Sequence, residues 1–290
     1  MKGKKHQFKN TMSRPWRIMN YIFLVIVFMT MFLPLWNVLV MSTSTALDAG
    51  ASGIKIWWKS FSLEGYEFIF RNMKIATPLK NSIIVSVSGT AAQVLLSALA
   101  GYVLIQNDMP FKKSITSFIM LTMMIPGDLT LISIYQLNKQ LGFLNSYTGL
   151  IINGLVSGFS ILLMRNYFLS VPYSLAESAR IDGSSELKIF YKIYLPLSGP
   201  GLATITFLEF VGKWNSVMIP ATITTDPNYF TLPLVLRNLV TDSAAISGAP
   251  LAKDNAIMAA IVITTIPLLL VYVFAQRFLT SGMTLGATKE

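Results

Sequence analysis

The chain has 290 residues, of which 53% are hydrophobic and only 12% are charged, and its formal net charge is +10. Because a soluble domain carries about 25% charged residues, this composition argues against a soluble protein and favours an integral membrane protein. The sequence contains no cysteine and one histidine, His6, which excludes disulfides, thiolate metal sites and cysteine nucleophiles. We expect no catalytic residue, no metal site and no nucleic-acid binding in this chain.

A basic tail at residues 1–17 is followed by six apolar runs, at about 18–41, 81–105, 114–136, 146–168, 197–219 and 256–278. Each run has about the 20 residues that an α-helix needs to cross a hydrocarbon layer roughly 30 Å thick. A cleaved signal peptide is an alternative for the first run, but its length and its Pro34, Trp36 and Asn37 favour a retained helix. The sequence therefore predicts an all-α membrane protein with six transmembrane helices.

The basic residues indicate how these spans are oriented. Taken together, the tail and the segments after the second, fourth and sixth spans hold more Lys and Arg than the other segments, most clearly in the tail and the short loops, and such an excess marks cytoplasmic segments. We therefore expect a multi-pass protein of the cell membrane with both termini inside (N-in and C-in). The predicted division is a basic cytoplasmic tail at 1–17, a first helix with an aromatic outer segment along the membrane surface at 18–80, a five-helix core at 81–279 and a cytoplasmic tail at 280–290.

Two of the spans carry features that bear on their packing. The run at 81–105 is rich in Ser, Ala and Gly, and such small residues let helices approach closely in lipid. We expect this helix at the centre of the bundle, with Asn81 and Gln93 in interhelical hydrogen bonds rather than in contact with a ligand. Pro126 and Gly127 interrupt the third run, and the break either serves packing alone or lines a pathway.

The fifth run contains two ionisable residues, Glu209 and Lys213, four positions apart and therefore on one helix face. Ionised groups at membrane depth are costly unless they are paired or face a water-filled cavity, so they indicate a substrate pathway. A mutually neutralised pair is the alternative. Trp214 and Asn215 follow directly, and an aromatic face and an amide suit stacking on a sugar and hydrogen bonding to it, although they would also serve as a membrane anchor.

A polar cytoplasmic loop at 171–196 separates the fourth and fifth runs. Pro172 opens it, and we expect Ser174 to cap a first short helix that ends at Ala179 or Ile181. Gly183 permits a left-handed turn or a close backbone approach, and Ser184 or Ser185 can start a second short helix. The loop therefore reads as a helix, a turn and a helix.

The same loop resembles the EAA motif of ABC importer permeases. Glu177, Ser178 and Ala179 stand for its E-A-A, three residues lead to Gly183, and nine more lead to the I-x-L-P of Ile193 to Pro196. Ser178 in place of the middle alanine is the one departure. The resemblance covers nearly the whole chain and is strongest to carbohydrate-uptake permeases of the maltose type, in the stretch after Pro126, in WNSVMIP at 214–220 and in the C-terminal tail.

The resemblance implies the type I importer permease fold and a division of labour between subunits. The loop would be a coupling helix that docks on a cytoplasmic ATPase subunit through Glu177, Ser178, Ala179 and Gly183, with Arg180 and Asp182 as flanking contacts. Two ATPase subunits would bind ATP and Mg²⁺, a second permease would pair with this one as a heterodimer, and an extracellular solute-binding protein would deliver a sugar or oligosaccharide. This chain has no Walker A pattern, so it is not expected to be an enzyme.

Two other functions remain open. An importer of the same architecture for polyamines, peptides or glycerol phosphoesters would keep the same loop. A secondary transporter or channel that works alone would not need the loop.

Overall fold

The computed structural model describes residues 13–241 and 253–287. Most of the basic tail, a stretch of the second outer segment and the last three residues, including Lys289, lie outside the described residues. Within the described ranges the secondary structure is helical, apart from one isolated bridge between Ser44 and Phe61. The chain divides into two compact units, 1–68 with 252–262 and 69–251 with 263–290.

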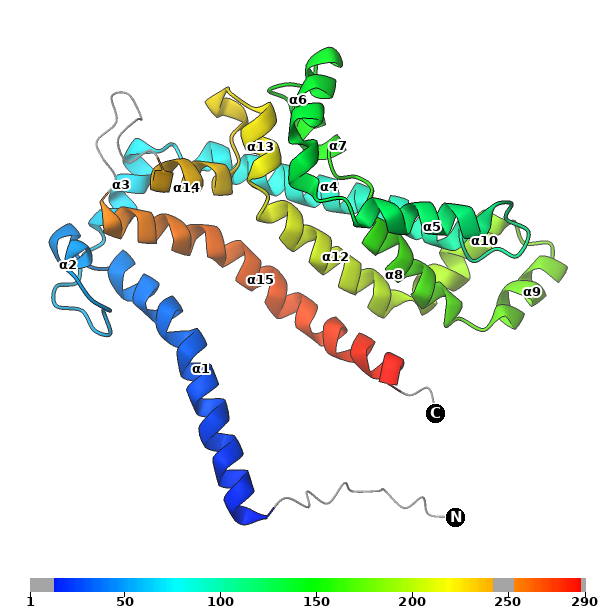
Figure 1. Ribbon diagram of the computed structural model, residues 1–290, viewed down its shortest axis with the longest axis horizontal. Helices are drawn as coiled ribbons and strands as arrows, with labels where there is room; N and C mark the ends of the chain where they lie inside the picture. Colours follow the sequence, from blue (N-terminus) through cyan, green and yellow to red (C-terminus); the bar gives the residue numbers. More distant parts are fainter. Residues whose placement is uncertain (1–12, 242–252, 288–290) are drawn as a thin grey trace. The chain divides into compact units, whose positions relative to one another are not determined.

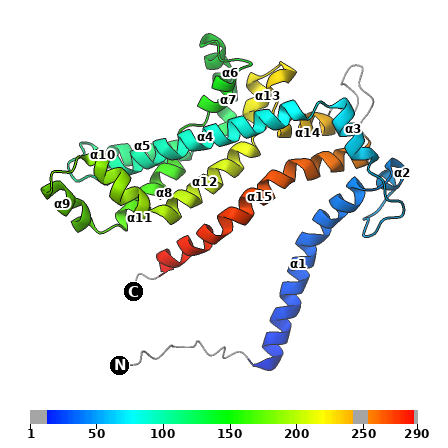
Figure 2. The same cartoon turned by 180° about the vertical axis from the view of Figure 1, so that it is seen from behind.

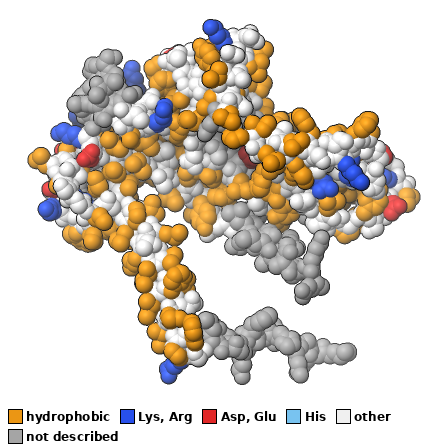
Figure 3. Space-filling view, in the orientation of Figure 1, with side chains coloured by type: hydrophobic (Ala, Val, Ile, Leu, Met, Phe, Trp, Pro, Cys, Tyr) orange, Lys and Arg blue, Asp and Glu red, His pale blue; other side chains and the backbone are white. Residues whose placement is uncertain are grey.

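The first unit is built on α1, Arg14–Ser42, which begins with Pro15 in its first turn. Its apolar side chains are exposed along its length, and Figure 3 shows orange side chains on both of its visible edges, with white backbone between them. A helix that is apolar on all sides requires an apolar surrounding such as lipid. The unit also contains α2, Ala46–Gly50, the start of α3, Glu64–Asn72, and the start of α15, Asp254–Ala287.

Hydrogen bonds tie the end of α1 to the aromatic segment that follows it. Trp36 Nε1 donates to the carbonyl oxygen of Ile56 at 2.8 Å, and Trp58 Nε1 donates to Thr43 Oγ1 at 2.6 Å. The two indole rings meet edge to face with centroids 5.8 Å apart. The aromatic side chains of this segment therefore help to order it, and its position along a membrane surface stays a prediction.

The second unit is organised around α4, Ala76–Val103, a continuous helix of 28 residues (Figures 1 and 2). It packs against α7, Tyr147–Ile152, α8, Gly158–Leu169, α12, Gly199–Trp214, and α14, Leu232–Thr241. A Cβ atom on Gly101 would lie 2.9 Å from the backbone nitrogen of Arg165, so this close approach to α8 requires glycine. The predicted central place of this helix is confirmed.

Asn81 fixes one end of α4. Its Nδ2 donates to the carbonyl oxygens of Asn228 and Phe230 at 2.8 and 2.9 Å, and Tyr147 donates from its hydroxyl to Asn81 Oδ1 at 2.7 Å. The side chain is completely buried, so its partners replace the water it loses. The polar contacts expected of Asn81 are confirmed, whereas Gln93 Oε1 is buried without a partner.

Three of the six predicted spans are broken into shorter helices. The third run forms α5, Lys112–Met123, the 3₁₀ turn Gly127–Thr130 and α6, Leu131–Gln140, as the Pro126 break predicts. The continuous helices expected over 146–168 and 197–219 are wrong, because α7 and α8 are separated at 153–157, and α12 is separated from α13, Met218–Ile223, at 215–217. Gly154, with φ of 91°, lies in the first of these breaks.

By length and composition, three described helices are long and apolar enough to cross a membrane, namely α1, α4 and residues Asp254–Arg277 of α15. The six-span count and the orientation therefore stay predictions.

An apolar core lies where α4 and α8 meet the predicted loop. Tyr102, Phe168, Phe190 and Tyr194 pack together with ring centroids 5.1–6.3 Å apart. They join α4 and α8 to the loop elements, which are α9, Tyr173–Ile181, α10, Glu186–Ile189, the π-helical turn Phe190–Tyr194 and α11, Leu195–Leu197. The loop is thus seated on the ends of the long helices.

Candidate functional site

The first half of the loop ends in a turn that only a few residue types accept. Ser184 donates its backbone N–H to the carbonyl of Ala179 at 2.9 Å, and Gly183 donates to that of Arg180 at 3.0 Å. These two bonds, with Gly183 at φ of 75°, form the Schellman arrangement that closes a helix. A Cβ at Gly183 would meet nothing within 4 Å, so the requirement for glycine comes from the backbone and not from crowding.

The second half begins at Ser185, whose Oγ accepts the N–H of Lys188 at 3.4 Å and caps α10. The predicted helix, turn and helix are confirmed. The cap expected from Ser174 is wrong: Pro172 is the N-cap residue, because its fixed backbone suits a helix start, and Ser174 lies inside α9.

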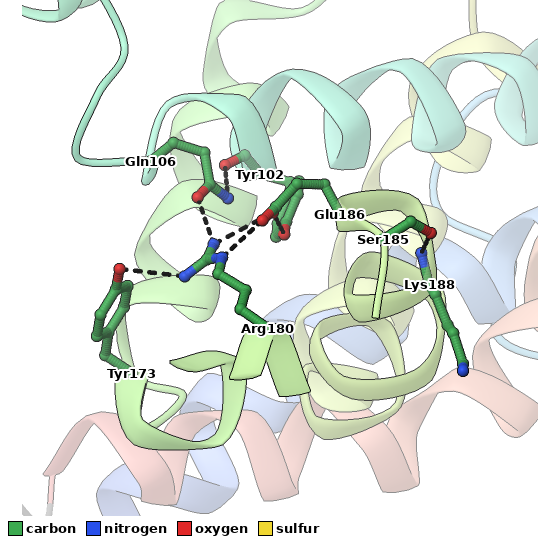
Figure 4. A network of polar contacts seen from close by, with 7 residues as sticks. All are labelled: Tyr102, Gln106, Tyr173, Arg180, Ser185, Glu186 and Lys188. Atoms are coloured by element: carbon green, nitrogen blue, oxygen red, sulfur yellow. Dashed lines mark hydrogen bonds and ion pairs between the residues drawn. The ribbon is translucent and has the colours of Figure 1, made fainter. Parts of the chain in front are cut away.

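A polar network binds the two halves of the loop to α4 (Figure 4). Arg180 Nε and Nη2 approach the two carboxylate oxygens of Glu186 at 2.6 and 3.1 Å, a two-bond ion pair. Arg180 also donates to Tyr173 Oη at 3.1 Å and to Gln106 Oε1 at 2.9 Å. Tyr102, near the end of α4, donates its hydroxyl to Glu186 Oε2 at 2.5 Å.

The network determines the ionisation of its members. Hydrogen bonds from Arg180, and to a smaller extent from Tyr102, hold the pKa of Glu186 below its usual value of 4.5, against the opposing effect of burial. The same ion pair raises the pKa of Arg180. Both groups are therefore charged at neutral pH, and the attraction between them persists across the physiological range.

The structure separates the predicted coupling residues into two groups. Ala179 and Arg180 are half-buried, the first against the apolar core and the second in the network. The other four are exposed: Glu177, Ser178, Asp182 and Gly183. Beside them Ile181 is 82% exposed and Leu187 is 66% exposed, which leaves an acidic and apolar face open on the loop. We call the six exposed residues the loop face.

Sequence reasoning missed the partners of Arg180. Tyr102 and Gln106 stand far from the loop in the chain, and nothing in their local sequence indicates a polar contact across that distance. From the sequence alone, Glu186 looks like an acidic residue that favours the N-terminus of a short helix through the helix dipole, with no sign of a further partner.

Glu209 and Lys213 both line a partly open cavity of about 330 Å³, whose wall is formed by α4, α7, the break at 153–157, α12 and α13. Ser160 on α8 donates its hydroxyl to Glu209 Oε1, and Lys213 Nζ donates to the carbonyl of Gly154 at 2.9 Å. Among the described residues the two charged groups form no ion pair with each other. Both charged groups lie at the wall of this cavity, and the choice between a substrate pathway and a neutralised pair stays a prediction.

Trp214 and Asn215 are not among the cavity-lining residues. Trp214 is 1% exposed, stacks on Phe210 and donates Nε1 to the carbonyl of Thr264 at 3.1 Å. Asn215 caps the end of α12 and is exposed. The structure therefore does not bring these two residues together with Glu209 and Lys213, and Trp214 serves to pack α12.

The chain is similar to known transport proteins over most of its length. Residues 93–285 match the family described as the binding-protein-dependent transport system inner membrane component. The chain is 33% identical to the polygalacturonan/rhamnogalacturonan transport system permease protein YtcP of Bacillus subtilis, covering 96% of this chain and 99% of that protein. It is 29% identical to the arabinooligosaccharides transport system permease protein AraQ of Halalkalibacterium halodurans, covering 92% and 94%.

A solved structure shares the fold. It is that of a bacterial ABC transporter involved in the import of the acidic polysaccharide alginate, with a TM-score of 0.84 and 24% identity, covering 94% of this chain and 99% of that chain. The chain thus belongs to the family of binding-protein-dependent transport system inner membrane components, the multi-pass permeases of ABC importers.

Proposed function

We propose that this chain is one of two permeases in an importer that moves a sugar or oligosaccharide into the cytoplasm, driven by ATP hydrolysis in two separate ATPase subunits. The observation that carries the proposal is the loop, which has the EAA spacing and presents an open face in a chain of this family. Its partners are a second, related permease, the two ATPases, an extracellular solute-binding protein and the surrounding lipid. The six spans with both termini inside belong to the same proposal.

The loop face is suited to docking on an ATPase subunit. Its exposed Ile181 and Leu187 supply apolar area, and Glu177 and Asp182 supply charge at its edge. Exposed apolar side chains rimmed by polar ones are typical of protein interaction sites. Of the six predicted coupling residues, we assign direct contact to the exposed ones and a supporting role to Ala179 and Arg180.

Movement of the loop would be passed on by α4. One end of this helix is tied to the loop through Tyr102, and the other end is tied to residues 228–230 through Asn81. A helix of 28 residues is about 42 Å long. When the ATPases close and shift the loop, α4 therefore carries the displacement across the membrane as a rigid body.

The names of the relatives and the cavity support a carbohydrate as cargo. One relative is named as a transport permease for polygalacturonan/rhamnogalacturonan and the other as one for arabinooligosaccharides. The cavity offers an acid, a base and an amide to a ligand, from Glu209, Lys213 and Gln93. Sugars are recognised through hydroxyl groups that both donate and accept hydrogen bonds, and such a lining provides both kinds of partner.

The proposal is tested by rebuilding the complex in liposomes and measuring the ATP-dependent uptake of labelled oligosaccharide. Uptake is expected only with both permeases, the ATPases and the solute-binding protein present. Glu177→Lys and Gly183→Asp should insert normally and abolish uptake, whereas Lys139→Gln, a charge change on α6, should not. Uptake without any ATPase would refute the importer, and a binding protein that accepts only amines or peptides would refute the cargo.

A further inference from the structure

Gln93 is a polar side chain that the coupling function leaves unexplained. It lies inside α4, is 2% exposed and lines the cavity that holds Glu209 and Lys213. Its amide oxygen, Oε1, is buried and accepts no hydrogen bond. A buried acceptor without a donor costs about 1–3 kcal/mol, so an unpaired amide oxygen on a residue that lines a cavity indicates a group that a bound molecule would satisfy once the side chain turns toward it.

The remaining polar groups of the cavity have capacity for a ligand too. Lys213 donates one of its three ammonium hydrogens to Gly154 and has two left, and Glu209 accepts one hydrogen bond from Ser160. Thr231, on the cavity wall, also has a buried hydroxyl without a partner. Lys213 and Glu209 therefore offer a donor and an acceptor, and apolar Val85, Leu150 and Ile219 are among the other lining residues.

The charge of the lining favours one class of ligand. Glu209 and Lys213 are the ionisable side chains of the cavity, and their formal charges cancel. A ligand carboxylate that met Lys213 would also lie near the Glu209 carboxylate, and that repulsion would oppose its binding. A hydroxyl group meets no such opposition, because it donates to the acid and accepts from the base.

We propose that this cavity is a subsite for an uncharged sugar residue, in which Gln93 Oε1 accepts a hydrogen bond from a sugar hydroxyl and selects for its presence. The inference rests on the proposed function and adds its substrate class. A volume of about 330 Å³ lies at the lower end of the range for small-molecule pockets, which suits one ring of an oligosaccharide at a time. Gln93 is a specificity residue, and Lys213 and Glu209 fix the ring around it.

The absence of cysteine from the chain makes a direct test possible. In the full importer complex, Ser216→Cys places a single reporter thiol on this chain at the cavity wall, and a small hydrophilic methanethiosulfonate reports whether water reaches it. The same labelling is repeated with millimolar arabinooligosaccharide, which is neutral, or galacturonate oligosaccharide, which is acidic. Leu95→Cys, exposed on the outside of α4, is the control for a lipid-facing position.

We expect Ser216→Cys to be labelled, Leu95→Cys to be labelled far more slowly, and the neutral oligosaccharide alone to protect Ser216→Cys. Adding Gln93→Leu should raise the concentration for half-protection about tenfold, equivalent to about 1.4 kcal/mol, while the labelling rate without sugar stays the same. Thr90→Val is the matched control, since Thr90 Oγ1 is also buried on α4 without a partner but does not line the cavity. That variant should leave protection unchanged.

Each contrary result overturns the inference. The inference is refuted if the thiol of Ser216→Cys does not react, or if neither oligosaccharide slows its labelling. It is also refuted if only the acidic oligosaccharide protects the thiol, or if Gln93→Leu does not change the protection. Because labelling needs no transport, a wild-type complex that fails to import any sugar on ATP would count against the proposed function separately from these outcomes.

Discussion

Replacing Glu186 with Gln should weaken the docking of the ATPase on this permease without changing the loop face. The substitution removes the charge that Arg180 and Tyr102 share, and its amide nitrogen presents a donor to two other donors. Since the Glu186 side chain is 53% exposed, solvent screens the ion pair to about 0.2–1 kcal/mol. Tyr102 is buried, and a weakened bond there adds about 1 kcal/mol.

A total of about 1–2 kcal/mol corresponds to a factor of roughly 5–30 in an equilibrium. If the network holds the loop in its docking conformation, the dissociation constant between purified permease and ATPase should rise by about that factor in Glu186→Gln. The measurement is a titration of labelled ATPase subunit into the detergent-solubilised permease pair. Lys139→Gln is the control, because it removes a charge from α6, away from the loop.

A double variant makes the reasoning sharper. Arg180→Gln with Glu186→Gln should weaken docking by little more than either change alone, because the two residues act through one shared contact. Docking that is unchanged in Glu186→Gln, or losses in the two single variants that simply add, would refute the idea that this network positions the loop.

Four further predictions concern single positions. Gly183→Ala should destabilise the loop by about 1–2 kcal/mol, because alanine is strained in the left-handed backbone of this position, and it should weaken ATPase docking more than Gly183→Asn. Equal weakening by both variants would indicate that the side chain disturbs a direct contact and not the backbone conformation. Gly201→Ala would place a Cβ 2.4 Å from the Tyr167 ring and should lower the melting temperature by an amount equivalent to about 1–3 kcal/mol. An unchanged melting temperature would show that the ring moves aside and that the close approach does not require glycine. Asn81→Leu leaves two backbone carbonyls without their donor and should speed hydrogen exchange around residues 228–230, while unchanged exchange would argue against the tie. The pKa of Glu186 in the folded protein is below 4.5, so its stabilising effect is complete above pH 4.5 and is lost as the pH falls through the folded-state pKa. The wild type should therefore melt at a higher temperature than Glu186→Gln by a constant margin from about pH 6 to 8, and this margin should disappear only in acid. A margin that is lost near neutral pH would contradict the assignment.

Features of the sequence that act locally were predictable. The left-handed turn at Gly183 and the close packing of α4 through its small residues follow from backbone freedom and side-chain size, and both predictions are confirmed. The breaks at 153–157 and 215–217 were missed because apolar composition is the same in one long helix and in two short ones. Contacts between residues far apart in the chain were also missed. The sequence suggested Trp214 as a pathway residue, but in the structure its ring packs on Phe210 and its Nε1 donates to the carbonyl of Thr264.

The carbonyl of Gly154 has a consequence for genetic studies of this family. The gap between α7 and α8 leaves Gly154 outside both helices, and its oxygen binds the Lys213 ammonium. Scanning mutagenesis alters side chains and retains the peptide bond, so a scan would remove the lysine ammonium directly but would disturb its partner only through the strain that a side chain at Gly154, with φ of 91°, puts on the backbone. Homologues that keep glycine at this position and exchange the other side chains of the gap would still offer the same acceptor, because the left-handed backbone of Gly154 sets where its carbonyl lies.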